Sequence, residues 1–289
     1  MKPATVREFF RKFPTDEACL AHLFDVRFGQ GHTCPKCERE AKWYPLKAER
    51  AFSCQWCGHH IHPMVGTLFE GSRTPLQLWF YAIFLFTTTR NGVAAKELQR
   101  QLGVTYKCAW RMGHKIRERM ALVGGDGMLG GMVEVAETFI GGHRPGGQGG
   151  KGKAIVMGML EKGGEIITEV VPDRTAKSLM PHIHDHIEKG SEVHTDEHGG
   201  YNPLDRTDDF ERLAVVHAEE EYVGDLGETT NSVEGFFSQL KRTVEGTHIS
   251  VSPKHLSKYA KECEFRFNRR QNPASMLPDL ISQFPSKDA

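Results

Sequence analysis

Two pairs of cysteines near the start of the sequence have the spacing of metal ligands. Cys34 and Cys37 form one Cys-x-x-Cys pair, and Cys54 and Cys57 form a second, with sixteen residues between the pairs. Each pair can supply two thiolates to the same Zn²⁺ ion, so the two pairs together complete its tetrahedral shell. Because four sulfurs leave no open coordination position, we expect a structural Zn²⁺. The segment Lys42–Phe52 between them suits a β-hairpin.

Acidic residues in the second half of the chain form a second set of candidate metal ligands. Asp196 follows a short β-type run and precedes a glycine turn, and Glu234 lies one turn into an amphipathic helix. Lys241 lies two turns later on the same face of that helix. Carboxylates at strand ends together with one on a helix can hold two Mg²⁺ ions beside a phosphate. Taken singly, each acid could equally be a solvated surface group.

A basic helix lies between these two sets. Residues 92–102 predict one helix, Gly103 a turn, and Tyr106–Met120 a second helix for which Thr105 is a reasonable N-cap. The expected outward-facing basic residues of the second helix are Lys107, Arg111, Lys115 and Arg119. A helix, a glycine turn and a basic helix form the layout in which the second helix enters a DNA major groove. The alternative is a helical hairpin with a solvated charged face.

The remaining pattern indicates an α/β fold after a glycine-rich break at residues 124–131. Short apolar runs predict strands, and longer amphipathic stretches predict helices. The expected strands are Met132–Ile140, Ala154–Leu160, Glu165–Val171, Glu192–Thr195 and Leu213–His217, and the expected helices are Ala176–Glu188, Val233–Thr243 and Pro253–Arg270.

Charge and composition narrow the class of protein. The 289 residues carry a formal net charge of +0. Residues 1–130 nevertheless hold 19 Lys and Arg against 11 Asp and Glu, a balance of +8, and the rest holds 18 against 26, a balance of −8. A basic first half favours a polyanionic partner. The longest apolar run is too short to cross a bilayer, no secretory signal is evident, and two cysteine pairs favour a reducing compartment. We therefore expect a cytoplasmic protein with no membrane partner.

Together these motifs resemble bacterial DDE-type insertion-sequence transposases, in the group with an N-terminal zinc ribbon that is related to eukaryotic Merlin elements. The resemblance covers nearly the whole chain, including residues 66–75, 195–201 and 262–270. It implies a zinc-ribbon region at 1–70, a helix-turn-helix region at 71–125, and an RNase H-like catalytic domain with a basic C-terminal helix at 126–289. Such enzymes use two Mg²⁺ ions to cleave transposon ends and join them to target DNA. The implied partner is double-stranded DNA, both terminal inverted repeats and target, bound by a homodimer at the bacterial nucleoid.

The resemblance also assigns catalytic positions, and one of them has lost its acid. Asp196 is the implied second acid, Glu234 the third, and Lys241 is expected near the scissile phosphate. Family members carry Asp where this chain has Ala136, so we expect the chain to bind DNA without cleaving it. Glu134 shares the strand face of Ala136 but lies about 6–7 Å along it, and Glu137 points to the opposite face, so neither replaces the missing acid well. An engineered substitution explains the alanine more simply than a naturally inactive copy.

Further basic residues are candidate DNA contacts. The glycine-rich loop at 141–153 contains Arg144 and Lys151, and residues 241–270 hold 8 Lys and Arg against 3 acids. In that second segment the candidates are Lys241, Arg242, Arg266 and Arg269. Because Glu262 shares a helix face with Arg266 and Arg269, these residues could form either a phosphate-binding strip or an internal salt bridge.

Two other functions remain open on the sequence alone. A regulator with a zinc ribbon and a helix-turn-helix could bind DNA without chemistry, which would leave Asp196 and Glu234 without a role. A nuclease of the same fold could cut DNA junctions without joining the ends.

Overall fold

The computed structural model describes residues 4–124, 127–141, 153–215 and 229–284. Contacts divide the chain into two units: residues 1–119 with 272–289, and residues 120–271. We call them unit 1 and unit 2 and describe each by itself. Within the described part of the chain, no helix combines the length and apolar character that crossing a bilayer requires.

Unit 1 begins with two helices and a small antiparallel sheet. Helix α1 (Val6–Lys12) starts with a capping box between Thr5 and Glu8, and α2 (Asp16–Arg27) follows with Thr15 as its N-cap. The sheet has the order β1-β2-β3, and the first pair is the hairpin expected between the cysteine pairs. Its strands are β1 (Trp43–Pro45), β2 (Phe52–Cys54) and β3 (His60–Ile61).

The rest of unit 1 is helical. The long apolar run forms α3 (Leu76–Thr88), whose aromatic side chains fill the core. Helix α4 (Ala95–Leu102) starts three residues later than predicted, because Gly92 adopts a left-handed turn (φ 82°) before it. Gly103 (φ 64°) ends α4 as a left-handed cap, and α5 (Tyr106–Leu122) follows.

The C-terminal segment joins unit 1. A short turn (η4, Pro273–Ser275) leads into helix α9 (Met276–Ser282), which lies against α2 and α3. Leu280 and Ile281 of α9 are buried. The sequence division had assigned residues 126–289 to one domain, but these apolar side chains group with the N-terminal helices.

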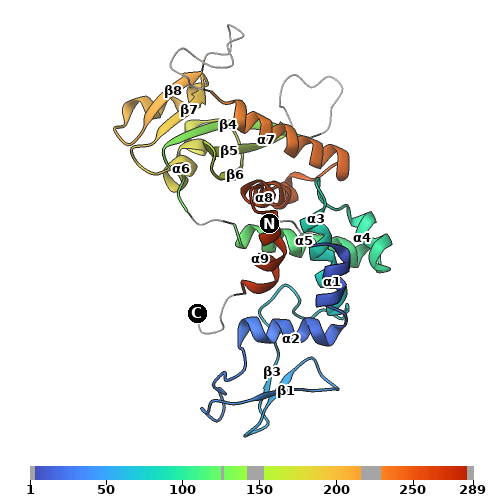
Figure 1. Cartoon of the computed structure of the whole chain (residues 1–289). Helices are drawn as coiled ribbons and strands as arrows, with labels where there is room; N and C mark the ends of the chain where they lie inside the picture. The colour runs from blue at the N-terminus through green and yellow to red at the C-terminus, as the bar shows by residue number, and fades with distance from the viewer. Residues whose placement is uncertain (1–3, 125–126, 142–152, 216–228, 285–289) are drawn as a thin grey trace. The chain divides into compact units, whose positions relative to one another are not determined.

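Unit 2 is a mixed five-stranded sheet with helices on both faces, which confirms the predicted α/β class (Figure 1). Its strand order is β6-β5-β4-β7-β8, in which β4 pairs antiparallel with β5 and parallel with β7. The strands are β4 (Met132–Ile140), β5 (Ala154–Glu161), β6 (Ile166–Val171), β7 (Glu192–Asp196) and β8 (Glu211–Val215). The other elements are α6 (Ala176–His186), η1 (Gly199–Arg206), α7 (Asn231–Arg242), η3 (Thr243–Thr247) and α8 (Pro253–Asn268).

Two apolar clusters cover the two faces of this sheet. One contains Val133 and Val135 of β4 together with side chains of α6 and η1. The other contains side chains of α7 and α8, and Ala136 packs against it. Alternate residues of β4 therefore face different helices, which is the period of a β-strand. This alternation decides which helix each acidic residue of β4 can reach.

Candidate functional site

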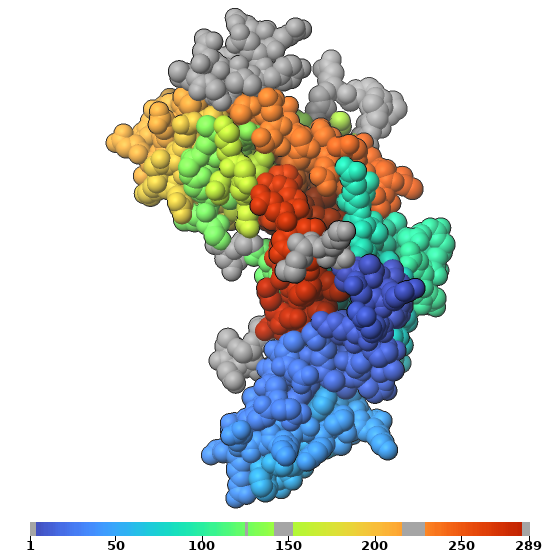
Figure 2. Space-filling view, in the orientation of Figure 1, coloured from blue at the N-terminus to red at the C-terminus, as the bar shows by residue number. Residues whose placement is uncertain are grey.

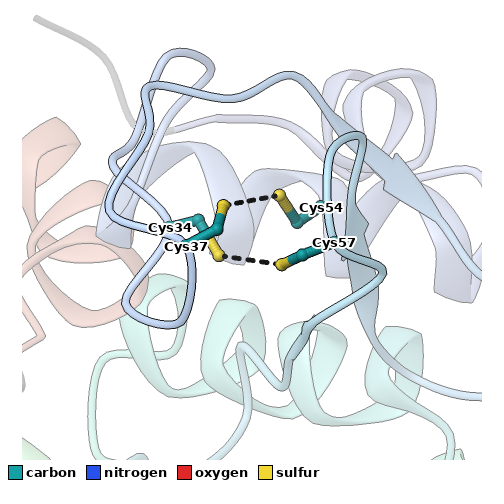
Figure 3. Close-up of side chains that lie close together, drawn as sticks. All are labelled: Cys34, Cys37, Cys54 and Cys57. Carbon is teal, nitrogen blue, oxygen red and sulfur yellow. Dashed lines mark hydrogen bonds between the residues drawn. The ribbon is translucent and has the colours of Figure 1, made fainter.

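The four expected zinc ligands converge in unit 1. The Sγ atoms of Cys34, Cys37, Cys54 and Cys57 all lie within 4.8 Å of one another. Figure 3 shows the four side chains pointing toward one another. The Cys34 and Cys57 sulfurs are 3.6 Å apart, and those of Cys37 and Cys54 are 3.9 Å apart. Among the described residues this is the one group of three or more potential metal-binding side chains that meets this distance. Four thiolates at this spacing fit a tetrahedral Zn²⁺.

The backbone shapes both halves of the zinc site in the same way. In each knuckle the residue after the second cysteine is left-handed: Glu38 at φ 55° and Gly58 at φ 69°. The amide of Glu38 donates to the Cys34 carbonyl at 2.8 Å, and that of Gly58 donates to the Cys54 carbonyl at 3.1 Å. Burial raises the pKa of the Cys34 thiol, but hydrogen bonds from the backbone of Cys37 and Lys36 outweigh it and lower that pKa to about 7. Burial, together with contacts to the other three thiols, raises the pKa of the Cys37 thiol to about 12.

The second candidate site lies where β7 ends beside the middle of the parallel strand β4. The last paired residues of the two strands are Glu134 and His194, and extending this parallel register by two residues matches Ala136 with Asp196. The first turn of α7, which carries Glu234, lies beside them: Glu134 accepts a hydrogen bond from the Ser232 amide. We call Ala136, Asp196 and Glu234 the strand-end face.

The carboxylate of Asp196 is held by an arginine that the sequence analysis did not single out. Arg174 Nη2 donates to Asp196 Oδ2 at 2.8 Å, and Arg174 Nε donates to Glu137 Oε2 at 2.9 Å. Tyr201 donates its hydroxyl to the other oxygen of Glu137, whose side chain is 1% exposed. Burial lowers the pKa of Arg174, but the two carboxylates outweigh it and raise that pKa above its usual range. Burial, together with Glu137, raises the pKa of Tyr201 well above 10.

The two glutamates near Ala136 already have partners. Glu137 is engaged by Arg174 and Tyr201 on the face opposite Ala136. Glu134 shares the face of Ala136, but its Oε2 accepts the amides of Ser232 and Val233. These contacts follow the strand alternation that the sequence predicts, although nothing local in the sequence pointed to the partners themselves.

Helix α7 buries its apolar residues and exposes its polar ones. Val233, Phe236 and Leu240 are buried against the second apolar cluster. Glu234 is exposed, and its Oε1 accepts the Thr230 hydroxyl at 3.3 Å. Lys241 and Arg242 are exposed in the last turn. The outer side of this helix belongs to the open surface of unit 2 (orange in Figure 2).

Helix α5 exposes basic residues in its first turns but uses later ones inside unit 1. Thr105 caps the helix by accepting the Cys108 amide at 3.3 Å, and Lys107 and Arg111 are exposed together with Thr105. Lys115 is half-buried, and its Nζ donates to the Leu68 carbonyl at 3.1 Å.

Arg119 corrects one prediction for α5. The sequence pattern placed it outward, but it is 7% exposed and lies over the Phe284 ring. Burial lowers its pKa to about 10. The C-terminal segment therefore covers the last turns of α5, a contact that helical periodicity does not reveal.

The sequence left two interpretations open for the charged face of α8: a phosphate-binding strip or an internal salt bridge. Arg266 is 8% exposed and forms a 2.6 Å ion pair with the buried Glu262. Arg269 is half-buried, stacks on Phe265 and donates to the Val123 carbonyl at 2.8 Å. The internal salt bridge, and not the phosphate-binding strip, describes this face, because the guanidinium groups satisfy partners within unit 2. Arg144 and Lys151 lie outside the described residues.

Known protein families match both the N-terminal region with the four cysteines and the region with the five-stranded sheet. A model of the ISXO2-like transposase domain matches residues 128–268, and a model of the transposase zinc-ribbon domain matches residues 14–60. An uncharacterised protein in the transposable element ISH50 of Halobacterium salinarum is 26% identical over 279 residues, 89% of this chain and 92% of that protein. An uncharacterised transposase-like protein of Haemophilus influenzae is 27% identical over 119 residues, 40% of this chain and 94% of that protein.

Proposed function

The chain belongs to the insertion-sequence transposases with an N-terminal zinc ribbon, and we propose that it binds transposon ends and carries a catalytic domain that lacks its first acid. Its partner is double-stranded DNA, the terminal inverted repeats and the target, bound by two copies of the chain because two ends must be held together. The mixed sheet of unit 2, with β4 parallel to β7 at its centre, supports an RNase H-like arrangement of that domain.

One observation carries the proposal: the parallel register of β4 and β7, in which Glu134 pairs with His194, matches Ala136 with Asp196 when it is extended by two residues. An acid at position 136, in the middle of β4, would stand beside Asp196 at the end of β7, with Glu234 on the helix that packs against β4. Three carboxylates from these positions match the donor set of a two-metal phosphoryl-transfer site. The position of the missing acid is thus the one where a metal-bridging carboxylate is needed.

The residues now present do not fit two Mg²⁺ ions. Ala136 offers no oxygen, and Oδ2 of Asp196 is in an ion pair with Arg174. Glu234 alone keeps an exposed carboxylate. We therefore expect the chain to bind DNA and to leave its phosphodiester bonds intact, even with Mg²⁺ in excess.

Exposed basic residues on two helices, α5 and α7, bind the DNA. Helices α4 and α5, joined by the Gly103 turn, support a helix-turn-helix whose second helix offers Lys107 and Arg111 to the DNA. Lys241 and Arg242 are exposed on the same helix as Glu234, where they can contact the phosphates next to the strand-end face.

The test is to return the acid. Ala136→Asp should produce Mg²⁺-dependent cleavage of element-end DNA and joining of the 3′ ends to target DNA, whereas the parent chain should produce neither. The matched control is Ala136→Asn, which has the same shape without the negative charge and should stay inactive.

Three outcomes contradict parts of the proposal. Cleavage by the parent chain would mean that position 136 is not the missing acid. Cleavage without joining by the Ala136→Asp protein would favour a nuclease of this fold. An inactive Ala136→Asp protein that still binds end DNA would favour a non-catalytic regulator.

A further inference from the structure

Helix α7 is capped only in part from its own segment: Thr229 Oγ1, just before the helix, accepts the Asn231 amide at 3.1 Å. Its N-cap residue, Thr230, makes no side-chain hydrogen bond to the helix backbone. The amides of the first turn of any helix lack partners within the helix, so they must find acceptors elsewhere. Here the acceptor comes from the sheet: Glu134 Oε2 receives the Ser232 amide at 2.8 Å and the Val233 amide at 2.9 Å.

The capping carboxylate is completely buried. Glu134 is 0% exposed, and its Oε1 has no hydrogen-bond partner among the described residues. Burying a carboxylate is costly unless hydrogen bonds and nearby positive charge compensate. The two amides and the positive end of the helix dipole provide that compensation at a single place, the start of α7. Glu134 is therefore well placed only when α7 begins at this position.

Two more contacts fix the start of α7 independently. His194 of β7, also 0% exposed, accepts the Thr229 amide on its Nδ1 at 3.1 Å. On β5, Gly158 lies under the helix, since a Cβ there would come within 3.0 Å of Phe237 and Val233. The beginning of α7 is thus tied to β4, β7 and β5, and Glu134 accepts two of its first amides.

We propose that Glu134 is a positioning residue, which caps α7 from the sheet and so sets where Glu234 stands relative to β4 and the end of β7. Glu234 directly follows the capped residue Val233, and Ala136 lies two residues after Glu134 on the same strand face. A single buried side chain thus links the strand of the first acid position to the helix of the third. The consequence for catalysis rests on the function proposed above, whereas the capping itself does not.

Hydrogen exchange tests the capping without any need for activity. Glu134→Leu keeps a side chain of similar size but removes both oxygens, so the amides of Ser232 and Val233 lose their acceptor. Losing a helix cap should make the amides of Ser232, Val233 and the following turn exchange about 3- to 30-fold faster. Glu161→Gln, a change at the end of β5, is the control and should leave exchange in α7 unchanged. Glu134→Gln lacks the negative charge but can still accept both amides on its one amide oxygen, so it should lie between Glu134→Leu and the parent.

Cleavage by the Ala136→Asp protein tests the positioning. Adding Glu134→Leu to it should lower kcat, by up to about 100-fold for an acid misplaced by 1 Å, and leave KM for end DNA unchanged. A purely structural role would instead lower the fraction of folded protein, which circular dichroism measures, and would not split kcat from KM.

The two experiments distinguish failure of the capping from failure of the positioning role and of the proposed function. Unchanged exchange in α7 would overturn the proposal whether or not the Ala136→Asp protein cleaves DNA. Faster exchange with unchanged kcat would overturn the positioning role. If the Ala136→Asp protein is inactive, the proposed function fails, and the exchange data alone then decide whether Glu134 sets the start of α7.

Discussion

The zinc ribbon and the strand-end face differ in how far apart their residues lie in the sequence. All four zinc ligands come from residues 34–57, on two knuckles joined by one hairpin. The strand-end face draws on positions 136, 196 and 234, from two strands and a helix. The ribbon is thus assembled by local contacts, whereas the strand-end face exists only once the whole sheet and α7 have formed.

This difference decides what one substitution does to each site. Because the ribbon is small, we expect its folding free energy to come largely from the metal. At the strand-end face Ala136 packs against the apolar cluster under α7, and the sheet around it is complete without an acid. Losing a ligand should unfold the ribbon, whereas losing an acid should remove chemistry from a sheet that stays folded.

The largest expected effect is therefore loss of zinc. Cys54→Ser should lower the zinc content well below one equivalent and unfold the ribbon, since structural zinc contributes on the order of 10 kcal/mol. Metal analysis and amide NMR spectra of residues 34–61 measure both effects. Cys108→Ser, which lies outside the cluster, is the control. A folded ribbon in the Cys54→Ser protein would show that local contacts suffice without the metal.

Next in size is the loss of a second acid. In the Ala136→Asp protein, Asp196→Asn and Glu234→Gln should each abolish cleavage of end DNA, because two ions need all three carboxylates. Thermal unfolding of unit 2 should stay close to that of the parent. A large drop in unfolding temperature would contradict this prediction, because it would mean that these acids also stabilise the fold, as the zinc ligands do in the ribbon.

A smaller effect is expected from the network behind Asp196. Tyr201→Phe removes a buried hydrogen bond to Glu137 and should cost about 1–3 kcal/mol in the free energy of unfolding. Tyr81→Phe, which removes an exposed hydrogen bond of 3.4 Å, should cost much less. Chemical denaturation measures both. Equal costs would mean that the Glu137 contact adds nothing beyond an ordinary surface contact.

The same tyrosine predicts a dependence on pH. Because burial raises the pKa of Tyr201 well above 10, the folded chain keeps its phenol protonated where the unfolded chain ionises. The free energy of unfolding should therefore fall as pH rises past 10. This component of the decline should be missing from the Tyr201→Phe protein, and equal slopes in denaturation series at rising pH would contradict the assignment.

The smallest expected effect concerns α5. Its basic residues lie close together in the sequence, as the zinc ligands do, but only some of them are exposed. Lys107→Ala and Arg111→Ala should each lower the log–log salt slope of DNA binding by about one. Lys115→Ala should leave the slope unchanged, because its ammonium group already donates to Leu68. Titrations at several salt concentrations measure these slopes. A reduced slope for Lys115→Ala would show that this side chain leaves Leu68 when DNA binds.

Several elements could be predicted because their signals are local. The strand Met132–Ile140 was predicted with its observed bounds, since an apolar run between glycines is itself the signal. The four cysteines predicted their own cluster by spacing alone. The turn at Gly103 and the cap at Thr105 were also predicted correctly, because one residue type at one position determines each.

Side-chain partners from distant segments could not be predicted in this way. Helical periodicity placed Arg119 outward, yet the C-terminal segment covers it. The charges on α8 allowed two interpretations until the ion pair of Arg266 with Glu262 was seen. Arg174 gave no signal at all, because a lone arginine after a strand resembles many surface arginines.

The sequence by itself determined the zinc ligands, the α/β class, the alternation along β4 and the absence of an acid at position 136. These features depend on residue type and on spacing within one segment. Only the tertiary structure decided that Arg174 holds Asp196, that Glu134 caps α7, and which basic residues are left exposed. The physical reason is that a hydrogen bond or ion pair between distant segments depends on strand register and helix placement, which no local pattern encodes.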